Sequence, residues 1–143
     1  MITDQLLRVS SAQAVTTTAV SADTIDLSVA RDIGEGKDLY MHFTVGTAFA
    51  GGTSTEFQVI SSASADLSSP TVIGSSGAIA TAGLTAGKRE AVRINPKLAS
   101  NGQRYLGARY VVVGTNSAGT VTADIVETVQ DGQKAYASGF SVV

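Results

Sequence analysis

The sequence predicts an all-β protein, an antiparallel sandwich or barrel with little or no helix. Apolar and polar residues alternate in many short segments, and clusters rich in Gly, Asn, Asp and Pro separate those segments. No stretch keeps a 3.6-residue apolar period over three turns, so the helical signal is weak. The length of 143 residues fits one domain. We expect a single β-sandwich domain over residues 15–143, preceded by an N-terminal arm or first strand over residues 1–14.

Five segments show the alternation that is typical of half-buried strands. Their expected inward positions are Ile25, Leu27 and Val29 in residues 24–30; Leu39, Met41, Phe43 and Val45 in residues 38–45; Phe57 and Val59 in residues 55–61; Val92 and Ile94 in residues 89–95; and Val121, Ala123 and Ile125 in residues 120–127.

A sixth segment, GQRYLGARYVVVGT over residues 102–115, interleaves basic and aromatic residues as single-strand nucleic-acid binders do. On a strand, however, Arg104 and Tyr110 lie on one face while Tyr105 and Arg109 lie on the other, so no aromatic platform forms. We therefore predict a strand that forms a hairpin with residues 120–127 through the turn TNSAG, with its valines in the core. Arg104 and Arg109 are then left to bond carboxylates, in this chain or across a subunit boundary.

Composition excludes several classes of function. The net charge of −2 argues against a protein that binds nucleic acid through bulk positive charge. The absence of cysteine excludes disulfides and thiolate metal sites. We expect neither a signal peptide nor a membrane span. Charged residues make up only 15% of the chain, and a surface of small neutral side chains is easy to bury against another protein.

Candidate catalytic groups are few. The one histidine, His42, falls on the polar face of its predicted strand, where we expect an ordinary surface residue. Asp32, Glu35 and Asp38 could together bind calcium or serve a carboxylate-based hydrolase, but a solvated turn is the simpler interpretation. Asp124, Glu127 and Asp131 are expected at the surface as well. The chain is therefore predicted not to be an enzyme and to carry no cofactor.

Five stretches resemble the capsid cement, or decoration, proteins of short-tailed bacteriophages, the family typified by a Bordetella phage. They are MITDQLLRVSSAQAV, DTIDLSVARDIGEGKDLYM, SSPTVIGSSGAIATAGLTAGK, GQRYLGARYVVVGT and VTADIVETVQDGQKAYASGF, and together they run nearly from end to end. The resemblance implies a jelly-roll β-sandwich that sits outside an icosahedral head whose shell protein has the HK97-type fold. It also implies dimers at two-fold positions that clamp neighbouring capsomers, with no catalysis.

The resemblance carries no residue-level motif for shell contact, so the candidate contact residues come from the sequence pattern alone. They are Arg31, Lys37, Tyr40, Arg104, Arg109 and Tyr136. A homodimer follows from the resemblance, and a trimer is the alternative. The protein is expected to be made in the host cytoplasm and to end on the outer surface of the virion. The competing function is a carbohydrate-binding β-sandwich displayed on the virion, although the absence of Trp counts against it.

Overall fold

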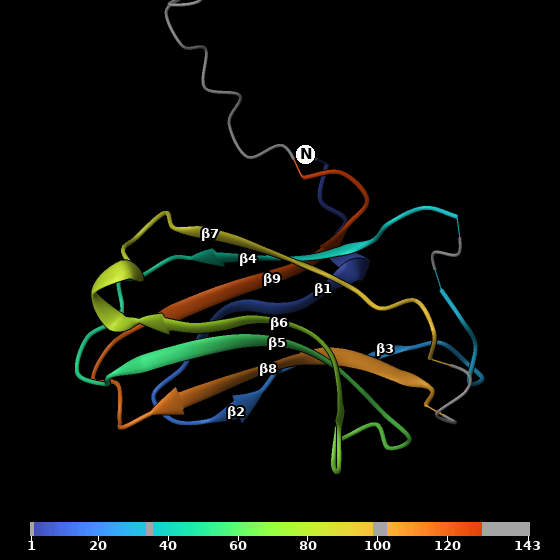
Figure 1. Cartoon of the computed structure of the whole chain (residues 1–143), viewed down its shortest axis with the longest axis horizontal. Helices are drawn as coiled ribbons and strands as arrows, with labels where there is room; N and C mark the ends of the chain where they lie inside the picture. The colour runs from blue at the N-terminus through green and yellow to red at the C-terminus, as the bar shows by residue number, and fades with distance from the viewer. Residues whose placement is uncertain (1, 34–35, 99–102, 130–143) are drawn as a thin grey trace, which may run out of the picture.

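Two antiparallel sheets pack face to face in the computed structural model, which describes residues 2–33, 36–98 and 103–129 (Figure 1). The strands are β1 (Arg8–Ala14), β2 (Ala19–Val20), β3 (Ile25–Asp26), β4 (Tyr40–Val45), β5 (Ser54–Ser62), β6 (Thr71–Ala80), β7 (Arg89–Arg93), β8 (Tyr105–Val113) and β9 (Thr120–Val126). Two 3-10 turns, η1 (Gln5–Leu7) and η2 (Thr81–Gly83), are the helical elements of the described residues. The predicted all-β sandwich is confirmed.

The order of the strands is that of a jelly roll. One sheet, called sheet A below, runs β1-β9-β4-β7, and the other, sheet B, runs β2-β8-β5-β6, with the short β3 also paired to β8. Strands that follow each other in sequence mostly lie in opposite sheets, as two interleaved Greek keys require. The chain therefore passes repeatedly from one sheet to the other. Most neighbouring strands within a sheet are distant in sequence.

The core lies between the sheets and is built from the alternating positions of the central strands. Met41, Phe43 and Val45 of β4 are at most 1% exposed and face Phe57 and Val59 of β5, which are fully buried. These strands are rich in β-branched and aromatic residues, which favour the extended backbone. The alternation predicted for residues 38–45 and 55–61 is thus confirmed from Met41 onward.

An aromatic cluster joins the two sheets at the centre of this core. The ring of Phe57 stacks on that of Phe43, with centroids 5.0 Å apart, and meets the edges of Tyr110 and Phe49 at 6.1 and 6.4 Å. Tyr110 is fully buried, and its hydroxyl donates a 2.7 Å hydrogen bond to the buried Ser10 of sheet A. Burial raises the pKa of the Tyr110 hydroxyl well above its ordinary value, so this link between the sheets stays protonated.

The predicted hairpin between residues 102–115 and 120–127 is wrong. β8 pairs with β5 in sheet B, whereas β9 pairs with β1 and β4 in sheet A, so the connection crosses from one sheet to the other. The buried Asn116 anchors this crossing, because its backbone and side-chain amides donate to the carbonyls of Thr16 and Val15. The local turn signal was correct, but a turn does not fix which sheet receives the next strand.

Two further expectations need correction. The valines of β8 contribute less to the core than expected, since Val113 is 54% exposed and the buried positions are Leu106, Ala108 and Tyr110. The strand expected over residues 24–30 is only two residues long. Ser28 has a φ of +68°, which breaks the extended backbone, and Val29 is consequently 54% exposed.

Candidate functional site

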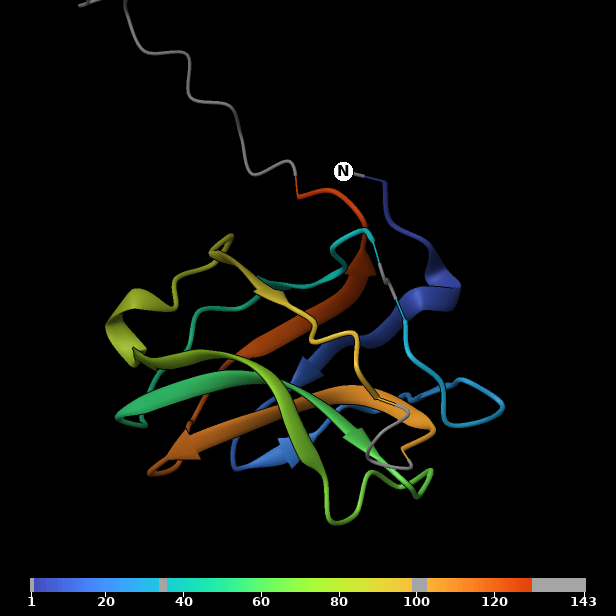
Figure 2. The same cartoon turned by 45° about the vertical axis from the view of Figure 1, so that its right-hand side comes forward.

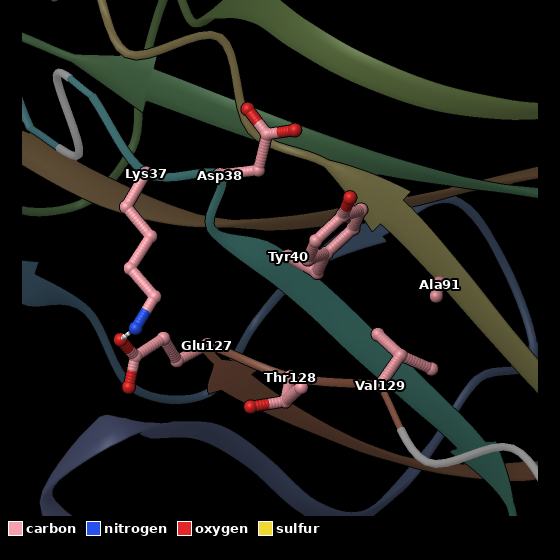
Figure 3. Close-up of a pocket in the computed structure, with 7 residues that line it drawn as sticks. All are labelled: Lys37, Asp38, Tyr40, Ala91, Glu127, Thr128 and Val129. Atoms are coloured by element: carbon pink, nitrogen blue, oxygen red, sulfur yellow. Dashed lines mark ion pairs between the residues drawn. The ribbon is translucent and has the colours of Figure 1, made fainter.

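The predicted contact residues Lys37 and Tyr40 lie together at one end of sheet A, beside an open hollow of about 470 Å³ (Figure 3). The hollow is lined by Lys37, Asp38, Tyr40, Ala91, Glu127, Thr128 and Val129, which come from the start of β4 and the residues just before it, from β7 and from the segment after β9. We call it the Tyr40 hollow.

Strand register explains why Tyr40 faces outward. Met41 and Phe43 point into the core, so Tyr40 must project from the opposite face of sheet A. Its cross-strand neighbours are Arg93 on β7 and Val126 on β9. The Tyr40 ring therefore lies on the outer face of sheet A at the start of the inner strand β4. It is half-buried, so part of the ring is exposed to solvent.

The charged residues at this hollow are paired within the chain. Arg93 donates to Asp38 from two nitrogens, at 2.6 and 2.9 Å, and Lys37 forms an ion pair with Glu127. All four side chains are about half exposed or more, so each pair contributes little to stability. The pairing leaves the hollow without an unpaired charge among these four side chains, beside the apolar surface of Tyr40, Ala91 and Val129.

The predicted arginines of the other sheet form a separate group. Arg104 holds Asp26 with two hydrogen bonds of 2.5 and 2.6 Å, and this partner lowers the pKa of the Asp26 carboxyl to about 2. Of the two partners expected for Arg104, a carboxylate of its own chain or one across a subunit boundary, the structure shows the first. The guanidinium also lies 5.2 Å from the centre of the Tyr105 ring.

Arg109 is held by an amide rather than by a carboxylate. Its Nε donates to Gln58 at 2.8 Å, and Gln58 in turn donates to Glu56 at 2.7 Å. Hydrogen bonds from Ser75 and Gln58 lower the pKa of Glu56. Since Ala108 and Tyr110 face the core, Arg109 projects from the outer face of sheet B, whereas Tyr40 projects from the outer face of sheet A. Tyr40 and Arg109 therefore lie on opposite outer faces of the sandwich.

The remaining candidates are distributed as follows. Arg31 is exposed in the loop between β3 and β4. Tyr136 lies outside the described residues, as does Glu35 of the suggested calcium or hydrolase set. Asp38 of that set is committed to Arg93. Within the described ranges, no three His, Asp or Glu side chains converge where they could hold a metal ion.

His42 and Asp124 differ from their expected exposure. Both lie on the outer face of sheet A, paired across strands, as the alternation predicts. They are nevertheless 1% and 4% exposed, so the expectation of surface residues is wrong. Arg8 of β1 donates to Asp124 at 2.7 Å, which compensates the buried carboxylate. Alternation tells which face a residue takes but not what covers that face, so no signal in the sequence could have shown this burial.

The chain is a jelly-roll sandwich with an open hollow at one end of sheet A, and the charged side chains at this hollow are paired within the chain. A comparison with protein-family models matches residues 9–125, more than four fifths of the chain, to the family Bbp16. The chain therefore belongs to the Bbp16 family, which is named for a Bordetella phage protein, and the predicted phage family is confirmed. No curated protein matches the sequence. In the part of the chain that the structure describes, no helix has the length and apolar character needed to cross a membrane.

Proposed function

We propose that this protein is a structural component of a phage particle that decorates the outside of an icosahedral head and cements neighbouring capsomers. The observation that carries the proposal is membership of a family named for a phage protein, together with the resemblance to cement proteins along the chain. The jelly-roll sandwich suits this role, because a rigid scaffold of two packed sheets presents fixed surfaces to its neighbours.

The candidate site favours contact rather than chemistry. The Tyr40 hollow is open, and its charged side chains neutralise one another within the chain. Aromatic residues such as Tyr40 are enriched in protein interfaces, because they bury much area with few rotatable bonds. In this proposal the protein acts without catalysis and without a cofactor.

The partners in this proposal are a second copy of the chain and a shell protein of the HK97-type fold, with no nucleic acid or membrane involved. A protein that binds the assembled shell but not the free subunit stabilises the shell by its binding free energy. Repeated over many copies, modest contacts then resist the outward pressure of packaged DNA. A homodimer matches two-fold positions on the shell, and a homotrimer would match three-fold positions.

The experiment uses phage heads that lack this protein. We expect purified protein to bind expanded heads at saturable stoichiometry and to raise the temperature at which they release DNA. Tyr40→Ala should weaken binding at least tenfold if the hollow contributes to contact, while Val29→Ala, which truncates another exposed side chain, should not. Thermal unfolding of each free variant shows whether the fold is retained. Failure of the wild-type protein to bind heads or to protect them would overturn the proposal.

A further inference from the structure

The outer face of sheet B is covered at one end and open at the other. At the covered end Leu67, from the loop between β5 and β6, is 2% exposed and lies against Gly107 of β8. Figures 1 and 2 both show this loop projecting beyond sheet B, on the side away from sheet A. Towards the other end of β8, Arg109 and Val111 are half-buried and Val113 is 54% exposed. This end of the face is therefore accessible to a partner.

Strand register makes the open end one continuous surface. The strands β2, β8, β5 and β6 align their side chains in cross-strand rows, and these side chains point outward because Phe57 and Tyr110 between them point into the core. One row holds Val20, Arg109 and Gln58, the next holds Val111, Glu56 and Ala78, and Val113 lies one row further along. We call these seven side chains the sheet B face.

One positive and one negative side chain are held in fixed positions on the sheet B face. Arg109 donates from Nε to Gln58 at 2.8 Å, Gln58 donates to Oε1 of Glu56 at 2.7 Å, and the hydroxyl of Ser75 donates to the same oxygen. Among the described residues, however, neither Arg109 nor Glu56 forms an ion pair, and the Nη atoms of Arg109 and Oε2 of Glu56 have no hydrogen-bond partner. Both groups can therefore still bond a group of opposite charge.

We propose that the sheet B face of one copy packs against the same face of a second copy around a two-fold axis, with Arg109 of each copy paired to Glu56 of the other. This inference rests on the dimer of the proposed function and specifies its surface. A two-fold contact brings a surface onto itself, so that surface must be complementary to itself. An axis parallel to the sheet and midway between Arg109 and Glu56 places each guanidinium opposite the carboxylate of the other copy. The charges of the sheet B face thus match a second copy.

The apolar side chains of the sheet B face suit the packing of one sheet on another. Val20, Val111 and Val113 are β-branched and have few rotamers to lose, and Ala78 is small, so two faces can approach to the roughly 10 Å that separates packed sheets. The hydrogen bonds that already hold Arg109 and Glu56 reduce the entropy cost of pairing them. One charge of each sign leaves the face without the net positive charge that attracts nucleic acid.

The test reverses the two charges one at a time. Arg109→Glu leaves two acidic side chains on the sheet B face and Glu56→Arg leaves two basic ones, so each variant should repel its own copies. By light scattering, wild-type protein should have the mass of a dimer, and the dissociation constant of each variant should be at least tenfold higher. An equimolar mixture of the two variants should restore the mass of a dimer, because the acidic face of one meets the basic face of the other. A wild-type monomer, single variants that dimerise as the wild type does, or a mixture that stays monomeric would overturn the inference.

Two valines of equal exposure give a matched pair of variants. Val113 on the sheet B face and Val29 in the loop after β3 are both 54% exposed. Val113→Asp should have the mass of a monomer at a concentration where Val29→Asp still has the mass of a dimer, because only Val113 is buried by the proposed contact. Circular dichroism and thermal unfolding check that both variants, and both charge reversals, remain folded. A Val113→Asp protein that is folded and dimeric would contradict the inference.

The inference and the proposed function fail in different ways. If wild-type protein binds and protects the heads but the two charge-reversed variants do not dimerise with each other, the dimer surface is wrong and the cement function stands. If the mixture dimerises but heads do not bind the wild-type protein, the surface is right and the cement function is wrong. If β8 gains protection from hydrogen exchange only on the head, the sheet B face contacts the shell protein and the inference is overturned.

Discussion

The buried hydrogen bond between Tyr110 and Ser10 allows a sharp test of what holds the two sheets together. The Tyr110 hydroxyl donates to Ser10, and Ser10 donates in turn to the side-chain carbonyl of Gln13, both at 2.7 Å. Tyr110 and Ser10 are fully buried, so neither can replace a lost partner with water. Ser10→Ala and Tyr110→Phe should therefore lower the free energy of unfolding by different amounts. Only Ser10→Ala leaves a buried polar group, the Tyr110 hydroxyl, without a hydrogen-bond partner.

Ser10→Ala leaves the Tyr110 hydroxyl buried and unpaired, which costs roughly 1–3 kcal/mol beyond the lost bond. Tyr110→Phe removes the donor while Ser10 still donates to Gln13, so the cost should be about 0.5–1.5 kcal/mol. The double variant removes both polar groups. Adding Tyr110→Phe to Ser10→Ala should therefore increase stability, reversing the sign of its effect in the wild-type background.

Equilibrium urea unfolding of the four proteins gives the free energies of unfolding for this double-mutant cycle. Tyr105→Phe is a matched control, since Tyr105 lies on the same strand but is only half-buried. It should change the free energy of unfolding by less than about 0.5 kcal/mol, the range of ordinary surface substitutions. A double variant less stable than Ser10→Ala alone would refute the reasoning, because the unpaired hydroxyl would then not be the source of the cost.

Two other predictions concern the packing of β6 and the effect of pH. Gly74→Ala places a Cβ 2.5 Å from the backbone carbonyl oxygen of Arg93, so one strand must move; we expect a loss of roughly 1–3 kcal/mol in thermal unfolding, with little loss in the control Gly83→Ala, whose nearest contact is 3.6 Å. Arg104 lowers the pKa of Asp26 from 3.8 to about 2. The ionised Asp26 therefore stabilises the folded state above pH 4, and this stabilisation is lost as the pH falls towards 2. The free energy of unfolding of Asp26→Asn should accordingly approach that of the wild type as the pH falls from 4 to 2. A constant difference from pH 7 to pH 2 would contradict this assignment. Added salt at pH 7 should reduce the difference, because the Arg104–Asp26 pair is exposed.

Local periodicity predicted the strands that form the centre of the sandwich. Met41, Phe43 and Phe57 occupy the inward positions that alternation assigns to them. Their strands β4 and β5 are each paired on both sides, and this pairing keeps the two-residue repeat of a flat ladder. For the same reason Arg109 and Tyr110 lie on opposite faces of β8, with Tyr110 in the core. Alternation is a property of the backbone within one strand, so it can be predicted without knowledge of the rest of the fold.

Features that depend on distant parts of the chain could not be predicted in the same way. The sheet that receives β9 is decided by β1 and β4, which start 112 and 80 residues before it in the sequence. Leu67 gives a second example: it is 2% exposed and lies over the outer face of sheet B, where a Cβ on Gly107 would come within 2.4 Å of its side chain. Its loop, with a left-handed φ of +56° at Leu67 itself, has no periodic signature.

The candidate site shows the same division. Lys37 and Tyr40 come from one short segment of the sequence, and they line the same hollow. Their partners Glu127 and Val129 follow β9, and only the pairing of β9 with β4 brings them there. β9 also pairs with β1 and contacts η1, so the residues that follow it are positioned by parts of the chain that are far apart in sequence.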